Sequence, residues 1–210
     1  MTMPTSQCPW RMQVHHIQQE TPDVWTLSLL CHDYYPYRAG QYALVSVRNS
    51  ADTLRAYTIS STPGVSEYIT LTIRRIDDGA GSQWLTRDVK RGDYIWLSDA
   101  QGEFTCDDKS EDKFLLLAAG CGVTPIMSMR RWLAKNRPQA DVQVIYSVRS
   151  PDDVIFADEW RNYPVTLVAE HNATHGFVEG RLSRELLQSV PDIANRTVMT
   201  CGPAPYMEIV

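Results

Sequence analysis

The apolar residues of this chain follow two different patterns, separated by one polar segment. Up to about residue 104, short segments rich in β-branched and aromatic residues are broken by Gly, Pro and Asp. Beyond residue 113, buried-strand patterns alternate with helical ones. The segment between them, CDDKSEDK at 106–113, is polar and charged, as domain boundaries commonly are. We therefore predict two domains, at 1–106 and 107–210.

The first domain is predicted to be an antiparallel six-stranded β-barrel, because its strand-like segments are short and are punctuated by turn residues. One short helix is expected to begin near Ser82 and to cover Gln83–Thr86. The expected strands are 12–17, 24–30, 42–47, a segment that carries 55–58, 68–73 and 94–97.

The alternation of strand and helix in the second domain predicts a parallel sheet flanked by helices. The expected strands are 114–119, 142–148, 165–169 and 197–200, and the expected helices are 125–136, 154–162 and 184–190. A further helix is expected after Pro203, and the chain stops a few residues into it. We therefore expect this α/β domain to be incomplete at its C-terminal end.

The charge balance argues against a nucleic-acid partner. The 210 residues carry a formal net charge of −5, whereas phosphate binding needs a basic face. No apolar run approaches the roughly 18 residues that a membrane span requires. Residues 1–10 lack the pattern of a secretory signal. We therefore predict a cytoplasmic protein with no nucleic-acid or membrane partner.

The five cysteines are scattered and form no Cys-x-x-Cys pair. This arrangement predicts reduced thiols, without a disulfide framework or a local zinc or iron–sulfur site. His171 and His175 have ligand-like spacing, but they lie in a loop that contains Gly and Asn. No metal site is therefore predicted.

The segment Arg55-Ala56-Tyr57-Thr58 is the first candidate binding motif. In a strand, Arg55 and Tyr57 point to one face and the other two residues to the opposite face. A guanidinium beside a phenol suits a bound phosphoanhydride with a neighbouring aromatic ring, here an isoalloxazine. The hydroxyl of Thr58 can reach a flavin ring nitrogen. Taken alone, the same pattern also fits an exposed Arg and a core Tyr in any barrel strand.

A second candidate contact is the turn Gly79-Ala80-Gly81-Ser82-Gln83. Glycines that lead into a helix leave backbone N–H groups available, and the helix dipole adds positive potential there. The turn therefore suits a pyrophosphate. The alternative is a plain Ser N-cap after a turn.

The segment Gly120-Cys121-Gly122-Val123-Thr124-Pro125 follows a predicted strand directly. Glycine there lets the backbone approach a phosphate, while Thr124 is expected as the N-cap and Pro125 as the first helical residue. The alternative is a generic strand-to-helix crossover. The segment differs from the Rossmann fingerprint, because Pro125 replaces the third glycine.

The strand that follows this helix ends in Ser147 and Arg149 rather than in a carboxylate that could grip ribose hydroxyls. These two residues could receive a 2′-phosphate, so the residues alone leave NADH and NADPH both open.

The segment Cys201-Gly202-Pro203 repeats the same order of strand end, glycine and helix-opening proline. Ligands of open parallel sheets bind beyond the carboxyl ends of the strands, where the Gly120 segment and Cys201 are both expected. The alternative for Cys201 is a buried, inert thiol.

With these segments in this order, the chain resembles the ferredoxin-reductase-like flavoprotein superfamily over nearly its whole length. Thr58 stands where that superfamily has a serine in its Arg-x-Tyr-Ser-x-x-Ser motif. The resemblance implies a flavin site that comprises Arg55, Ala56, Tyr57, Thr58, Ser61, Thr72, Ile73, Arg74, Gly81, Ser82 and Gln83. It implies a nucleotide site that comprises Gly120, Gly122, Val123, Thr124, Pro125, Ser147, Arg149, Cys201, Gly202 and Pro203. Thr58 and Cys201 take the catalytic positions, beside the flavin and the nicotinamide.

The implied activity is hydride transfer from NADH to FAD, followed by electron release to an iron–sulfur acceptor. Residues 7–16, 31–37 and 158–160 are most similar to the branch of the superfamily that reduces hybrid-cluster protein. That likeness implies NADH as donor and hybrid-cluster protein, or another iron–sulfur redox protein, as acceptor. It also implies a 2Fe-2S cluster in a domain absent from this chain. The alternatives are the reductase of an oxygenase, a free-flavin reductase, or an inactive, truncated flavin-binding module.

Overall fold

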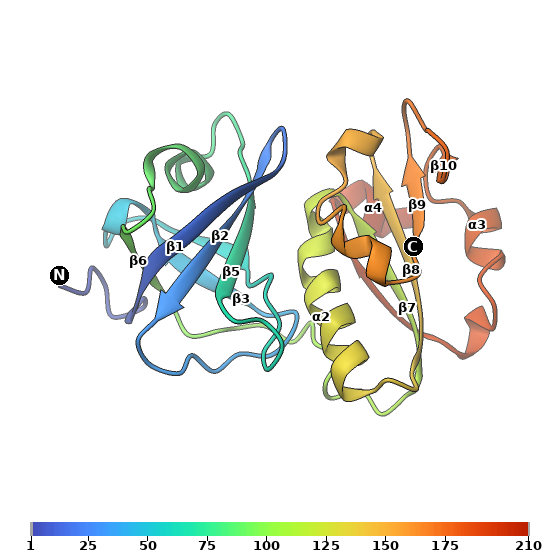
Figure 1. The fold of residues 1–210 in the computed structure, drawn as a ribbon, viewed down its shortest axis with the longest axis horizontal. Coiled ribbons are helices and arrows are strands. Elements are labelled where there is room, and N and C mark those ends of the chain that lie inside the picture. Colours follow the sequence, from blue (N-terminus) through green and yellow to red (C-terminus); the bar gives the residue numbers. More distant parts are fainter. Residues whose placement is uncertain (1, 210) are drawn as a thin grey trace. The chain divides into compact units, whose positions relative to one another are not determined.

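The computed structural model describes residues 2–209 and divides into two compact units, Met1–Asp108 and Lys109–Val210. Figure 1 draws the strands β1–β6 of the first unit and the strands β7–β11 of the second. None of the helices formed by the described residues has both the length and the apolar character that a membrane crossing needs.

The first unit is an antiparallel six-stranded sheet in the order β4-β3-β6-β1-β2-β5. Its outer strands meet through a bridge between Ile59 and Leu71 and a hydrogen bond of 2.9 Å from the Ser60 N–H to the Thr70 carbonyl. These contacts bring the two edges of the sheet together, and the predicted six-stranded architecture is confirmed. The strands are β1 Trp10–Thr21, β2 Val24–Cys31, β3 Tyr42–Ser46, β4 Leu54–Thr58, β5 Ile69–Arg74 and β6 Tyr94–Leu97.

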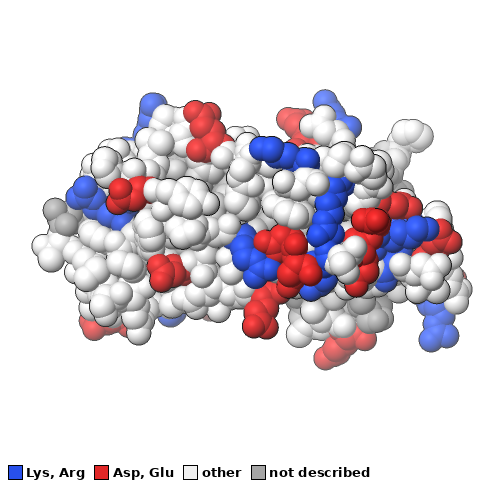
Figure 2. Space-filling model, turned by 90° about the horizontal axis from the view of Figure 1, so that it is seen from below, with Lys and Arg blue, Asp and Glu red and all other residues white. Residues whose placement is uncertain are grey.

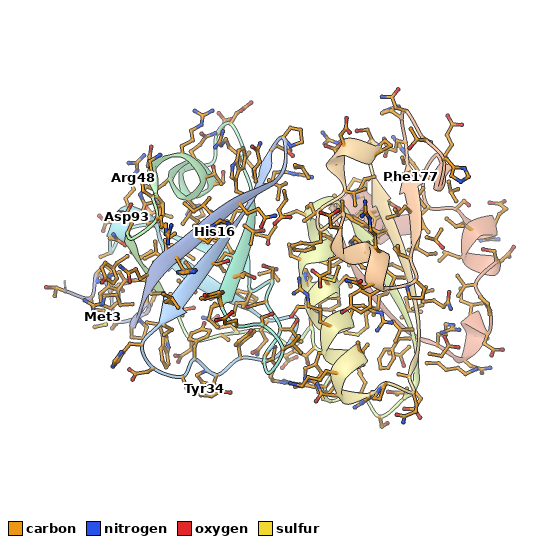
Figure 3. The ribbon with its side chains drawn as sticks, viewed as in Figure 1. Met3, His16, Tyr34, Arg48, Asp93 and Phe177 are labelled. Carbon is orange, nitrogen blue, oxygen red and sulfur yellow. The ribbon has the colours of Figure 1, made fainter. Side chains whose placement is uncertain are left out.

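Alternation along the strands fills the core of this unit. On β1, Met12 and Val14 are buried and pack against Leu27 and Leu29 of β2. Each such side chain contributes about 1.5–3 kcal/mol on burial. His16, two residues after Val14, is exposed instead (Figure 3), because a register shift between Val14 and His16 interrupts the alternation.

The short helix predicted near Ser82 is present but begins earlier. The helix α1 spans Ala80–Gln83 and continues as a π-helical turn over Trp84–Asp88. Gly79, not Ser82, is its N-cap residue. The Ser82 hydroxyl instead donates to the Gly79 carbonyl at 3.2 Å and accepts from the Ile76 N–H at 3.0 Å. The serine therefore stabilises the helix start from within the first turn.

The second unit is a parallel five-stranded sheet in the order β10-β9-β8-β7-β11, as the strand and helix alternation predicted. All residues of β7 after Lys113 are buried, as expected for a central parallel strand. The strands are β7 Lys113–Ala119, β8 Asp141–Val148, β9 Thr166–Ala169, β10 Phe177–Glu179 and β11 Thr197–Cys201. The helices are α2 Val123–Asn136, α3 Arg184–Gln188 and α4 Ala204–Ile209.

One expectation for this unit was wrong, and one short strand was not predicted. No α-helix covers 154–162, where two 3-10 turns, Pro151–Asp153 and Glu159–Asn162, flank Phe156 in a left-handed conformation with φ of 61°. A left-handed residue cannot continue a right-handed helix, so the apolar spacing there serves burial of Ile155 and Trp160 instead. The strand β10, which carries Phe177 (Figure 3), was not predicted because it has only three residues.

Lys and Arg side chains are interleaved with Asp and Glu on the face of the molecule drawn in Figure 2. One buried cation stands apart from these surface charges. Arg196, 8% exposed, donates to the carbonyls of Pro191 at 2.7 Å and Phe114 at 3.0 Å. It also binds Asp141, at its carbonyl (3.0 Å) and its carboxylate (2.9 Å). Arg196 therefore ties the starts of β7, β8 and β11 together.

We expect Arg196→Met to lower the free energy of unfolding by about 3 kcal/mol, because it leaves several buried acceptors without their donor. Urea unfolding followed by tryptophan fluorescence measures this change. Arg181→Met is the matched control, since the Arg181–Glu170 pair (3.2 Å) involves an arginine side chain that is 75% exposed. The control substitution should lower the free energy of unfolding by less than about 1 kcal/mol. Equal losses for the two variants would contradict this role for Arg196.

The same pair makes stability depend on pH. The hydrogen bond from Arg196 holds the pKa of Asp141 below its ordinary value. The stability that this carboxylate contributes is therefore complete above the pKa of the unfolded chain and is lost as the pH falls through the lower, folded pKa. Since the Asp141 side chain is 45% exposed, we expect this pH-dependent contribution to the free energy of unfolding to be less than about 1 kcal/mol. Urea titrations at about pH 6 and about pH 3 should show a larger acid loss for the wild type than for Arg196→Met.

Candidate flavin and nucleotide sites

Two of the candidate flavin residues on β4, Arg55 and Tyr57, approach Gly81 in the first unit. A Cβ atom built on Gly81 would lie 2.5 Å from the Tyr57 hydroxyl oxygen and 3.1 Å from Cγ of Arg55. Arg55 and Tyr57 are therefore on the same face of β4, as their alternation indicates, and both reach the first turn of α1. Only a residue without a side chain fits at position 81 in this arrangement.

The electrostatics of this cluster suit an anion beside a ring. Arg55 is exposed, and its guanidinium donates to the carbonyl of Leu54 at 2.9 Å. Burial raises the pKa of the Tyr57 phenol, and the charge of Arg55 only partly offsets that rise. Tyr57 therefore stays protonated at neutral pH, available as a neutral aromatic surface and hydrogen-bond donor.

The start of α1 adds backbone donors. The first bond of this helix runs from the Gln83 N–H to the Gly79 carbonyl at 2.9 Å, so the N–H groups of 80–82 precede the intrahelical ladder. Gln83 itself turns back, and its side-chain amide donates to the Ile76 carbonyl at 2.8 Å. Of the predicted turn residues, Gly81 and Ser82 are buried and Gln83 is partly exposed.

The remaining predicted flavin residues have side chains already engaged within the barrel. The Ser61 hydroxyl accepts from Tyr37 at 2.9 Å and from the Thr70 N–H at 3.0 Å. Thr72 is hydrogen-bonded to Ser60 at 2.8 Å. Ile73 is part of the core, and Arg74 lies 3.4 Å from the Asp23 carboxylate. Any contact of these residues with a flavin would therefore be made by the backbone groups of Ser61, Thr72 and Ile73. Ala56 is exposed and Thr58 is partly buried.

The nucleotide motifs of the second unit meet at the carboxyl ends of two neighbouring strands. Cys201, at the end of β11, pairs with Ala118 near the end of β7. A Cβ atom on Gly122 would lie 2.5 Å from the carbonyl carbon of Cys201 and 2.8 Å from Cα of Gly202. The 3-10 turn Gly120–Gly122 therefore packs directly on the backbone of the Cys201-Gly202-Pro203 segment. Gly120 has φ of 57°, which glycine adopts without strain.

The helix start after this turn differs from the expected one. α2 begins at Val123 with Gly122 as N-cap, so Thr124 is not the cap and Pro125 is the third helical residue. The Thr124 hydroxyl donates to the Cys121 carbonyl at 3.0 Å. Pro125 is still accommodated, because first-turn residues need no N–H partner within the helix. Val123, Thr124 and Pro125 are all buried.

Three hydroxyls near these strand ends have unmet hydrogen-bonding capacity. Among the described residues, the hydroxyl oxygens of Ser147, Thr200 and Tyr206 are buried without a well-formed hydrogen bond, although Ser147 lies near enough to the Tyr206 hydroxyl to interact with it. Burial raises the pKa of Tyr206 to about 12, and the nearby Ser147 opposes the rise. A buried polar atom without a partner costs about 1–3 kcal/mol, which a bound polar ligand can offset. The residues present therefore fit a nucleotide.

Thr200 and Tyr206 were not predicted as site residues, although their positions beside Cys201 and after Pro203 offered a signal. Arg149 is exposed just beyond β8, and its carbonyl accepts from the His171 N–H at 2.8 Å. The Cys201 thiol is partly buried, and burial raises its pKa. Cys201 is therefore a protonated thiol at neutral pH. In the described part of the chain, no three His, Cys, Asp or Glu residues form a cluster that could hold a metal ion.

Comparison with known proteins finds a family model that matches most of each unit. Residues 12–106 match the oxidoreductase FAD-binding domain, and residues 116–210 match the oxidoreductase NAD-binding domain. The chain is 88% identical over its full length to NADH oxidoreductase HCR of Escherichia coli (strain K12) and covers 65% of that protein. It is 31% identical, over 99% of its length and 62% of the relative, to the glycine betaine monooxygenase reductase subunit of Chromohalobacter salexigens. The chain thus spans somewhat less than two thirds of these relatives.

Solved structures share the fold at low sequence identity. Phthalate dioxygenase reductase matches with a TM-score of 0.82 at 23% identity, covering 99% of this chain and 64% of that one. The FAD/NAD binding domain of nitric oxide dioxygenase from Vibrio cholerae matches with a TM-score of 0.84 at 22% identity, covering 96% and 90%. Both matches include the antiparallel and the parallel sheet.

Proposed function

We propose that this chain, which belongs to the ferredoxin-reductase-like flavoprotein superfamily, takes electrons from NADH onto FAD and passes them to an iron–sulfur redox partner. The observation that carries the proposal is that each unit gathers its motif residues at a turn where only glycine fits, Gly81 in one and Gly122 in the other. The matches to an FAD-binding domain and an NAD-binding domain support the same assignment.

In the first domain, which we take as 1–106, Arg55 would pair with the FAD phosphates and Tyr57 would stack on the ring system. The N–H groups of 80–82 would bind the pyrophosphate, since they carry the positive end of the helix dipole. The Thr58 hydroxyl would orient the ring at the reacting edge. FAD, when bound, supplies the chemistry that accepts two electrons at once and releases them singly.

In the second domain, which we take as 107–210, the turn Gly120–Gly122 and the start of α2 would hold the NADH pyrophosphate. Ser147, Thr200 and Tyr206 would supply hydrogen bonds to the nucleotide. The protonated Cys201 thiol would contact the nicotinamide without acting as an ion. No residue has to move a proton in the hydride step, so the contribution of these residues is positioning.

The test is to load the protein with FAD and mix it with NADH without oxygen. We expect the flavin absorbance near ~450 nm to fall, and NADH to act faster than NADPH at matched concentration. Clear preference for NADPH would overturn the assignment of the donor, in favour of a 2′-phosphate bound at Ser147 and Arg149. A protein that binds FAD but is not bleached by either nucleotide would instead be a flavin-binding module without reductase activity.

For the acceptor we propose hybrid-cluster protein, because the sequence resembles the reductases of that protein over its whole length. Electrons would leave through a 2Fe-2S cluster outside this chain, so the test uses the whole protein. Hybrid-cluster protein should be reduced faster than an unrelated iron–sulfur protein. The second candidate is the reductase component of an oxygenase, which the 31% identity to a monooxygenase reductase subunit favours. A free-flavin reductase would instead reduce added flavin at least as fast as it reduces any protein acceptor.

We also propose a cytoplasmic location, supported by the five cysteines, all of which carry thiols in the structure.

A further inference from the structure

The backbone segments that carry two of the cysteines, Cys121 and Cys201, meet at the nucleotide turn of the second unit. Cys201 ends β11 and pairs with Ala118, three residues before Cys121. Gly122, the neighbour of Cys121, packs on the Cys201 carbonyl so closely that a Cβ atom on Gly122 would lie 2.5 Å from the carbonyl carbon. Burial is the main cause of the raised pKa of the Cys201 thiol, and the charge of Cys121 adds to the rise. Each of the two residues is partly exposed.

The other three cysteines lie in the first unit. Cys8 and Cys106 are completely buried, in the first unit. Cys31 is partly exposed at the end of β2, also in the first unit. Cys121 and Cys201 are thus both partly exposed, and they lie in two backbone segments that pack on each other within the second unit.

We propose that Cys121 and Cys201 form a reversible dithiol modification site, which a small peroxide converts into a disulfide. Glycines on both sides of Cys121 allow the turn to adjust to the Cβ–Cβ separation of about 3.8 Å that a disulfide needs. The helix that follows the turn and the strand that precedes Cys201 can then stay in place.

The chemistry balances with peroxide as the oxidant. The Cys121 sulfur attacks one peroxide oxygen, the O–O bond breaks, and Cys121 becomes a sulfenic acid while water leaves. The Cys201 sulfur then attacks the Cys121 sulfur, the S–O bond breaks, and the thiol proton leaves with the hydroxyl as a second water. Two thiols are oxidised and one peroxide is reduced to two waters. A dithiol reductant reverses the change.

Oxidation would also distort the candidate nucleotide site, a consequence that rests on the proposed function. The disulfide would bridge the turn that is proposed to hold the pyrophosphate and the residue proposed to contact the nicotinamide. Because a displacement of about 1 Å costs about 100-fold in a reaction governed by positioning, we expect NADH-dependent flavin bleaching to fall about 100-fold. The rate should return after treatment with dithiothreitol.

The decisive experiment maps the disulfide directly. FAD-loaded protein is treated with hydrogen peroxide, its remaining thiols are alkylated, and it is digested with trypsin without reductant. We expect peptide 114–130 to be joined to the peptide that begins at residue 197. Its mass should be about 2 Da below the sum of the two, because two hydrogens are lost. Cys31→Ser is the matched control and should retain the joined peptide, whereas Cys121→Ser should lack it.

Two results would overturn the proposal. One is oxidation of Cys121 or Cys201 to higher acids without a joined peptide, and the other is a joined peptide that involves Cys31 at equal yield. The bleaching rate of each protein is compared with its own untreated rate, and Cys121→Ser should keep its rate after peroxide. If untreated protein is not bleached by NADH, the proposed function fails, while the peptide map still decides whether the dithiol site exists.

Discussion

Replacing Gly122 by alanine is expected to lower the rate of NADH-dependent flavin bleaching about 100-fold while the protein keeps its FAD. The new Cβ atom would lie 2.5 Å from the carbonyl carbon of Cys201 and 2.8 Å from Cα of Gly202, both closer than real Cβ contacts. These neighbours are backbone atoms, so no side-chain rotation relieves the clash. The turn and the Cys201 segment must separate, which displaces two proposed parts of the nucleotide site together.

The matched control for Gly122→Ala is Gly180→Ala in the same unit. Gly180 has φ of 111° and no atom within 4 Å of a Cβ position, so this change carries the backbone cost of losing glycine without a clash. Because this φ strains any residue that has a Cβ atom, the change should lower stability by about 1–3 kcal/mol and leave the bleaching rate within about twofold. Stopped-flow absorbance with NADH measures both variants. Similar rates for Gly122→Ala and Gly180→Ala would show that the close approach at Gly122 has no bearing on the reaction.

Replacing Gly81 by alanine is expected to weaken FAD binding about 100-fold, equivalent to about 2.7 kcal/mol. The added methyl would lie 2.5 Å from the Tyr57 hydroxyl oxygen and 3.1 Å from Cγ of Arg55. The rigid phenol ring has to rotate or shift, and Arg55 has to move with it. Both the proposed stacking contact and the proposed phosphate contact are then lost.

The FAD affinity of Gly81→Ala is measured by titrating apoprotein and following flavin fluorescence. Gly92→Ala is the control, because Gly92 has φ of 95° and open space around its Cβ position. That control should bind FAD as the wild type does, with about 1–3 kcal/mol less stability because of the strained φ. An unchanged FAD affinity in a folded Gly81→Ala protein would remove Tyr57 and Arg55 from the proposed flavin site.

Several features of the fold were predictable because they depend on neighbouring residues alone. The short, partly alternating segments of the first unit, with turn residues between them, predict an antiparallel sheet, and the alternation of apolar strands such as β7 with helices predicts a parallel one. The glycine motifs likewise identified the turns that lie at the strand ends. Residue 156 shows the limit of such patterns. The spacing at 154–162 resembles a helix, but Phe156 adopts φ of 61°, and the segment folds as two separate turns around it.

The amino-acid sequence by itself determined where apolar and polar residues alternate, which turns contain glycine and which strand ends carry a thiol or hydroxyl. Only the tertiary structure decided that Gly81 meets Tyr57, that Gly122 meets Cys201, and that the hydroxyls of Ser147, Thr200 and Tyr206 are buried without a well-formed hydrogen bond. The reason is physical. Periodicity and turn propensity act over a few residues, whereas close approach and desolvation depend on segments that are 24 to 79 positions apart in the sequence and meet only after the sheets have formed.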